Sequence, residues 1–161
     1  MRIVGFDPGT IATGYGVVSF DAGCLIFESC GVFRPPAALS LAGKLHVLFT
    51  RAGQLLEECR PAAVSVETVF TGRNVASAMK LAHARGVLLA AAAQLEIPVY
   101  EYEPRLVKKA LVGYGNAEKP QVRSMVLTLL ARQRSRMPLD AADALAVAIC
   151  HAHAGAGDGR R

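Results

Sequence analysis

Apolar runs separated by turn residues predict three β-strands in the first part of the chain. The first run ends at the turn signal Asp7-Pro8-Gly9, and two segments rich in β-branched and aromatic residues follow it. An Asp-Ala-Gly step at 21–23 separates these two segments and predicts a hairpin. We therefore predict an antiparallel meander whose three strands cover residues 3–6, 13–20 and 25–33.

A helical period replaces the strand pattern after Pro35-Pro36. Apolar residues recur every three or four positions over 39–59, with Ser40 as the expected N-cap. Short apolar runs then alternate with longer helical segments, which is the order expected for a mixed sheet covered by helices. The remaining predicted strands lie at 62–66 and 99–102. The remaining predicted helices lie at 75–95 and at about 104–112, about 119–132 and about 138–153.

These elements predict an α/β fold with a mixed five-stranded sheet flanked by helices on both faces. The chain has 161 residues, of which 52% are hydrophobic and 19% charged. That length suits one domain, and that composition excludes disorder for most of the chain. We predict a single domain over residues 1–154 and a disordered tail over residues 155–161.

Three further features bear on the cellular setting. The most apolar stretch, 86–95, is too short to span a bilayer and contains Gln94. The first residues lack the basic, apolar and cleavage segments of a signal peptide, so we expect a cytoplasmic protein. The cysteines form no CxxC pair, and we expect all four to be small, reduced core residues: Cys24, Cys30, Cys59 and Cys150.

Basic residues are concentrated in one segment of the chain. The formal net charge is +5, yet residues 105–136 contain eight lysines and arginines and a single acid, Glu118. A concentrated basic segment on a near-neutral scaffold is what binding to a nucleic-acid backbone requires. A solvated helix face followed by a basic turn explains the same segment equally well.

Four carboxylates stand where the apolar pattern predicts little water. Asp7 and Glu67 each end an apolar strand, and Asp140 and Asp143 lie one turn apart on an Ala-rich helix. Ligands of open α/β sheets gather at strand ends, so we expect these four acids to converge. A divalent cation such as Mg²⁺ or Mn²⁺ would remove their repulsion, since hard cations take carboxylate oxygens.

Each acid also has an ordinary structural explanation. Asp7 could be a turn residue, Glu67 could pair with an arginine, and Asp140 could be an acid favoured at a helix N-terminus. Asp143 is harder to explain in this way, because alanine and leucine surround it. A metal site accounts for all four positions at once, and we therefore favour it.

Four blocks of sequence resemble the RuvC family of Holliday-junction resolvases, in the ribonuclease-H-like superfamily. The match runs in register from residue 1 to about residue 154, and four specific blocks in order are a strong signal. The blocks are MRIVGFDPGTIATGYGVV, VSVETVFTGRNVASAMKLAHARG, VYEYEPRLVKKALVGYGNAEKPQV and LDAADALAVAICHAH.

This resemblance implies a ribonuclease-H-like fold and an endonuclease that cuts four-way DNA junctions as a homodimer. It implies symmetric nicks in two strands of like polarity, and cooperation with the RuvA–RuvB branch-migration complex. It assigns the acidic metal-binding set to Asp7, Glu67, Asp140 and Asp143. Phosphodiester hydrolysis at such a set would use two ions, Mg²⁺ or alternatively Mn²⁺, with Asp7 bridging both.

The resemblance also points to residues that contact DNA. Phe70 matches an aromatic residue that stacks on junction bases, although it could instead be a dimer contact or partly buried. Lys108 and Lys119 match positions that contact DNA near the scissile phosphate. Arg73 and Asn74 adjoin Phe70 and are candidates for phosphate or base-edge contacts.

Two more features are weaker. The helix that begins at Val75 carries a series of small residues, which would allow a second helix to approach closely, so it is the candidate dimer interface. Its small residues are Ala76, Ala78, Ala82, Ala84 and Gly86. His151 and His153 could support the acidic site from behind, but surface positions are the favoured interpretation.

Three other functions compete with junction cleavage. A ribonuclease-H-like nuclease of pre-16S ribosomal RNA shares an early and a late acid but leaves the match over 105–123 unexplained. The FDPGT…TGYG hairpin also resembles the phosphate-binding start of sugar-kinase-like ATPases, which need a second such hairpin and a longer chain. A non-catalytic junction binder would not need four intact acids.

Overall fold

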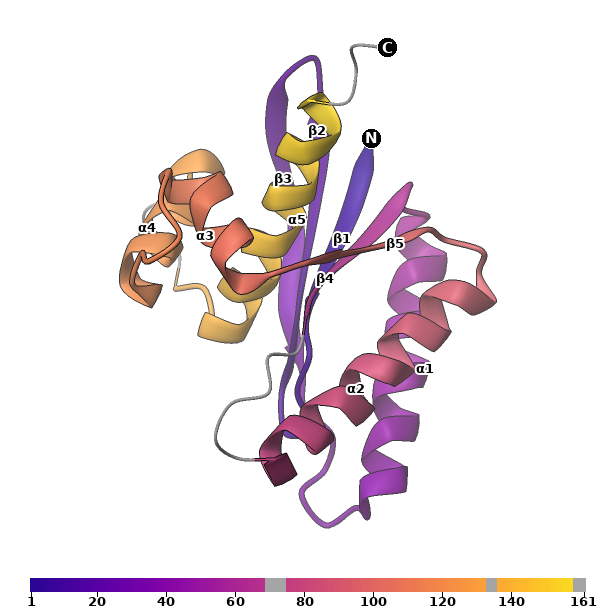
Figure 1. The fold of residues 1–161 in the computed structure, drawn as a ribbon. Helices are drawn as coiled ribbons and strands as arrows, with labels where there is room; N and C mark the ends of the chain where they lie inside the picture. Colours follow the sequence, from indigo (N-terminus) through magenta and orange to yellow (C-terminus); the bar gives the residue numbers. More distant parts are fainter. Residues whose placement is uncertain (69–74, 133–135, 158–161) are drawn as a thin grey trace.

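The computed structural model describes residues 1–68, 75–132 and 136–157 of the chain. A single five-stranded sheet runs through its centre in the order β3-β2-β1-β4-β5 (Figure 1). The first three strands pair antiparallel, whereas β4 and β5 run parallel to β1. The strands are β1 (Arg2–Asp7), β2 (Thr13–Asp21), β3 (Cys24–Phe33), β4 (Ala63–Glu67) and β5 (Val99–Tyr102).

Helices cover both faces of this sheet (Figure 1). The first pair packs on one face, and the other three pack on the opposite face, so two apolar cores form with the sheet between them. The expected mixed sheet with helices on both faces is therefore confirmed. The first pair is α1 (Leu41–Cys59) and α2 (Val75–Gln94), and the others are α3 (Pro104–Val112), α4 (Lys119–Leu129) and α5 (Leu139–Gly157).

Alternation along β1 decides which face each of its side chains meets. Val4 and Phe6 are fully buried in the core under α1 and α2, and Ile3 lies in the core on the α5 side. Successive side chains on a strand point to opposite faces. Asp7 therefore points to the same face as Ile3, toward α5.

The helix α5 lies directly on the backbone of the central strands because glycines leave room for it. A Cβ atom on Gly5 would stand 2.1 Å from the carbonyl oxygen of Ala144, and one on Gly14 would stand 1.9 Å from that of Asp140. No side chain fits at those distances without a backbone shift. These two glycines bring the N-terminal turn of α5 close to the end of β1.

The ends of α1 follow local signals in the sequence. The hydroxyl of Ser40 accepts a hydrogen bond from the N–H of Gly43 at 3.2 Å, which confirms the predicted N-cap. The last helical residue is Cys59, and the C-cap Arg60 after it has a left-handed backbone with φ of 44°. Its buried face consists of Leu48, Ala52 and Leu56.

Two predicted helix ends were wrong. The helix α4 ends at Leu129 rather than near 132, because the chain turns through Ala131, whose φ is 52°. A glycine would have signalled that left-handed turn in the sequence, but none is present. The helix α5 continues to Gly157, so residues 155–157 are helical and not part of a tail.

The cysteines match the prediction only in part. All four are free, as expected, and Cys150 is buried. Cys24, however, is exposed at the start of β3, and Cys30 and Cys59 are half-buried, so the prediction that all four are core residues was wrong.

Within the described part of the chain, no helix has the length and apolar character needed to cross a membrane.

Candidate active site

The four acids converge at one end of the sheet, as the strand pattern predicted. Asp7 closes β1 and Glu67 closes β4, and these strands are parallel neighbours with Phe6 opposite Val66. Ser65 lies opposite Gly5, which faces α5, so Glu67 and Asp7 both point toward that helix. Asp140 and Asp143 stand on the first turns of α5, above the two strand ends.

The acids are close enough to disturb one another's ionisation. Burial, together with the charges of Asp143, Glu67 and Asp140, raises the pKa of Asp7 from 3.8 to about 7. Burial and the charge of Asp143 likewise raise the pKa of Glu67. A group of carboxylates in this state has a strong electrostatic demand for a cation.

Two lysines partly meet that demand. The ammonium of Lys119, at the start of α4, donates a hydrogen bond to Asp143 Oδ2 at 3.1 Å. The carboxylate of Asp143 raises the pKa of Lys119. The positive charge of Lys119 in turn offsets part of the rise in the pKa of Asp7 and Glu67. Lys108 on α3 lies near enough to lower the pKa of Glu67 as well. The structure thus brings both predicted DNA-contacting lysines to the acids.

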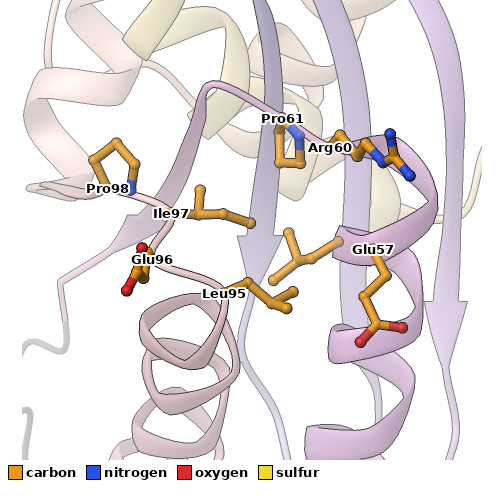
Figure 2. Close-up of a pocket in the computed structure, with 8 residues that line it drawn as sticks. Glu57, Arg60, Pro61, Leu95, Glu96, Ile97 and Pro98 are labelled. Atoms are coloured by element: carbon orange, nitrogen blue, oxygen red, sulfur yellow. The ribbon is translucent and has the colours of Figure 1, made fainter.

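A cavity of about 540 Å³ opens beside the acids, and its lining includes Asp7, Asp140, Asp143 and Lys119. A smaller cavity of about 70 Å³ adjoins Glu67 and Lys108. A third cavity, of about 630 Å³, lies between the C-terminal ends of α1 and α2. Figure 2 shows this third cavity, where the carboxylates of Glu57 and Glu96 stand on either side of apolar side chains. The cavity of about 540 Å³ beside the acids has carboxylates and a lysine in its lining, so it suits a charged ligand.

The donor set fits a hard divalent cation, although it is not assembled as a ready-made metal site. All four acids offer carboxylate oxygens, which are the ligands that Mg²⁺ and Mn²⁺ prefer. Among the described residues, no three acids, histidines or cysteines stand in a coordinating arrangement. The ammonium of Lys119 instead forms an ion pair with the carboxylate of Asp143. A cation would therefore draw the carboxylates inward and compete with Lys119.

The structure adds Arg34, which the sequence reasoning missed, and brings Arg123 of the basic segment to the acids. A guanidinium nitrogen of Arg34, just after β3, lies 3.8 Å from Asp140 Oδ2. Arg123 lines the cavity beside the acids and donates to the carbonyl oxygen of Met137 at 2.7 Å. The position of Arg34 between a strand end and Pro35-Pro36 was a visible signal, because strand ends carry the acids too.

The basic segment 105–136 does not act as one surface. Lys108, Lys119 and Arg123 lie at the acids, but the guanidinium of Arg132 lies 4.6 Å from the centre of the Phe27 ring on β3. Phe70, Arg73 and Asn74, the predicted base and phosphate contacts, lie outside the described residues.

His151 is not a surface residue, so the favoured interpretation was wrong. Its side chain is buried, and Tyr102 Oη lies 2.6 Å from its Nδ1 atom. The ring of Tyr100 lies against the imidazole with centroids 4.3 Å apart. Burial lowers the pKa of His151 and favours the neutral ring, whose Nδ1 atom shares a hydrogen bond with the hydroxyl of Tyr102. His151 thus joins α5 to β5.

The small residues of α2 divide between two roles. Ala84 is buried within the chain's own core, together with Leu88. Ala76, Ala82 and Gly86 are exposed and leave a face of the helix uncovered in the single chain. Only that exposed face is available for a second copy.

Known proteins match the chain over nearly its whole length. The family model described as crossover junction endodeoxyribonuclease RuvC matches residues 3–151. The crossover junction endodeoxyribonuclease RuvC of Roseiflexus sp. strain RS-1 is 47% identical over 144 residues, covering 89% of this chain and 86% of the relative. The RuvC of Heliobacterium modesticaldum is also 47% identical, over 145 residues, covering 90% of each chain.

The fold is shared with a solved structure that contains DNA. The structure of Thermus thermophilus RuvC in complex with a Holliday junction substrate matches this chain with a TM-score of 0.90. The two sequences are 35% identical, and the match covers 96% of this chain and 94% of the other.

Proposed function

This chain belongs to the RuvC family of crossover junction endodeoxyribonucleases, and we propose that it resolves four-way DNA (Holliday) junctions by symmetric paired nicks during recombination and repair. The observation that carries the proposal is the convergence of Asp7, Glu67, Asp140 and Asp143 beside Lys108 and Lys119. Carboxylates that repel one another can hold cations, and the adjacent ammonium groups can attract a phosphate.

The four acids would hold two divalent cations, Mg²⁺ or alternatively Mn²⁺. Such ions, when bound, activate a water and stabilise the leaving 3′-oxygen in an in-line displacement at phosphorus. Asp7 is the best placed to serve both ions, since it lies on the central strand among the other three acids. Glu67 would serve from the β4 side, and Asp140 and Asp143 from α5.

The chain's own cations orient the substrate. Lys119 is bound to Asp143 yet 82% exposed in its side chain, so it can swing toward a phosphate when its carboxylate partner is neutralised. Lys108 stands on the Glu67 side of the same cavity system. Together they would hold the scissile phosphate at the acids and offset part of its charge.

Recognition of a whole junction requires two such sites. We propose a homodimer through the exposed face of α2, because two copies related by a two-fold axis would match a four-way junction and space two cuts. Phe70 would stack on bases at the crossover, with Arg73 and Asn74 contacting the backbone beside it. Cooperation with the RuvA–RuvB complex and a cytoplasmic location complete the proposal.

The substrate is tested by offering matched nucleic acids to the same preparation in Mg²⁺ and in Mn²⁺. We expect paired nicks at symmetric positions in a four-way junction and little cutting of linear duplex of the same sequence. Cleavage of structured RNA in preference to the junction would support the ribosomal RNA nuclease instead. Junction binding without cleavage in either metal would support a non-catalytic binder.

A further inference from the structure

Arg34 stands beside Asp140, on the side of the acidic cluster away from Glu67 and Lys108. Its guanidinium approaches Asp140, and Asp140 lies over β2, where its carbonyl oxygen abuts Gly14. Lys108 and Lys119 reach the acids from α3 and α4, and the charge of Lys108 lies close enough to Glu67 of β4 to stabilise its carboxylate. The sheet order places β3 and β2 on one side of β1 and β4 on the other. The acids are therefore flanked by positive charge on both sides.

The backbone holds Arg34 firmly while leaving its side chain free. Phe33 before it is buried and stacks on Tyr15 with ring centroids 4.8 Å apart, and Pro35 after it is buried too. A following proline restricts Arg34 to extended conformations. Its side chain is nevertheless 61% exposed. This combination presents a guanidinium to solvent at a fixed place.

The ion pair with Asp140 does not account for Arg34. The distance of 3.8 Å is long, Asp140 itself is 39% exposed, and exposed ion pairs of this kind contribute little to stability. A cation bound at Asp140 would remove most of the attraction. Arg34 would then be an unpaired guanidinium next to an occupied metal site, and its planar fork suits a phosphate.

We propose that Arg34 binds the backbone phosphate next to the scissile one, on the β3 side of the acids. The proposal rests on the proposed function, because it requires the cleaved strand to cross the acidic cluster. The strand would then contact Lys108 on one side of the cut and Arg34 on the other, with Lys119 beside the acids between them. Arg34 would fix the path of the strand and leave the hydrolysis itself to the acids.

The test compares Arg34→Ala with Arg34→Lys and with Arg51→Ala, which removes the same charge from an exposed position on α1. Junction binding is measured in Ca²⁺ over a range of salt concentrations. Arg34→Ala should bind about tenfold more weakly, and its salt dependence should correspond to about one phosphate contact fewer. Arg34→Lys should keep the salt dependence, and Arg51→Ala should resemble the wild type.

Junctions with a single methylphosphonate locate the contact. The wild type should lose affinity when the neutral group replaces one particular phosphate beside the cleavage site, and Arg34→Ala should lose nothing further there. Equal losses for both proteins at every position would overturn the proposal.

Mn²⁺ affinity measured without DNA separates this role from simple support of Asp140. Arg34→Ala should bind Mn²⁺ at least as well as the wild type, since Asp140 loses a competing cation. Weaker Mn²⁺ binding with unchanged junction affinity would overturn the proposal and make Arg34 a support for Asp140. A wild type that does not bind or cut junctions would instead overturn the proposed function itself.

Discussion

At the scale of single residues, the four converging acids oppose the stability of the fold. Asp7 is held among three other carboxylates in a half-buried position, and its pKa is raised to about 7. Such an arrangement costs free energy in the absence of a cation, which is the usual mark of a site built for a ligand rather than for folding. The sequence showed this as acids in apolar surroundings, but it could not show how far each pKa moves.

The pKa of Asp7 predicts a pH-dependent stability. Between its ordinary value of 3.8 and its folded value of about 7 the folded chain binds the proton more tightly, so stability contributed by Asp7 falls as pH rises through that range. We expect Asp7→Asn to raise the free energy of unfolding by about 1–3 kcal/mol at pH 8 and by much less at pH 4. Urea unfolding in EDTA measures both.

Asp21→Asn is the control, because Asp21 is exposed at the end of β2 and far from the cluster in the sheet register. It should leave the wild-type pH profile unchanged. An Asp7→Asn profile that runs parallel to the wild type between pH 4 and pH 8 would contradict the assignment of the raised pKa to Asp7.

The buried pair of Tyr102 and His151 gives a second prediction at this scale. Removing the hydroxyl in Tyr102→Phe leaves Nδ1 of a buried imidazole without its hydrogen-bond partner, which should cost about 1–3 kcal/mol of stability. Tyr100→Phe removes a hydroxyl from a half-exposed residue that meets the same imidazole through its ring, and should cost little. Thermal unfolding measures the stability of the two variants. Equal losses of stability would contradict the hydrogen bond between Tyr102 and His151.

At the scale of elements, the sequence was a good guide to where strands and helices lie and a poor one to how closely they pack. The apolar runs that end at Asp7 and Glu67 predicted that two strand ends would bring these acids together, and the i, i+3 spacing of Asp140 and Asp143 predicted a shared helix face. The contact of α5 with the strand backbones at Gly5 and Gly14 was not predictable, because it depends on which glycine lies under which helical turn.

The packing of α5 predicts the effect of a single methyl group. Gly14→Ala would place a Cβ atom 1.9 Å from the carbonyl oxygen of Asp140, so α5 must shift away from the sheet. We expect a loss of about 1–3 kcal/mol in stability and weaker Mn²⁺ binding, since Asp140 moves with the helix. Calorimetric unfolding and Mn²⁺ titration measure the two effects.

Gly53→Ala is the matched control on α1, where a Cβ atom would meet nothing within 4 Å. It should stabilise the chain by about 0.5–1 kcal/mol, because alanine is the better helix former. If Gly14→Ala were as well tolerated as Gly53→Ala, the close approach of α5 would not be needed for the fold.

At the scale of the whole molecule, four sequence blocks identify the family, and the match to RuvC proteins over most of the chain confirms the expected ribonuclease-H-like class. Assembly is the property that a single chain does not display. The helix α2 has one face in the core through Ala84 and another exposed through Ala82 and Gly86. The exposed face is therefore the part of α2 on which the proposed dimer can be tested.

A charge on the exposed face of α2 should therefore separate the proposed dimer. We expect Ala82→Glu to shift the protein from dimer to monomer in sedimentation velocity at micromolar concentration, because the carboxylate would be buried without a partner. Gln54→Glu, at an exposed position on α1, should sediment as the wild type does. A wild type that is monomeric at every concentration would contradict the proposed interface.

The central claim is that the acids at the strand ends hold the metal that cuts the junction. The most direct test is the rate of paired cleavage of one four-way junction in Mg²⁺ by the wild type and by Asp7→Asn, with binding of the same junction followed in Ca²⁺. The account predicts symmetric nicks by the wild type. Asp7→Asn should cut roughly a thousandfold more slowly, which is the effect expected from losing a main electrostatic group of an active site, and it should bind the junction as tightly as the wild type does. Cleavage by Asp7→Asn at a rate close to that of the wild type would contradict it.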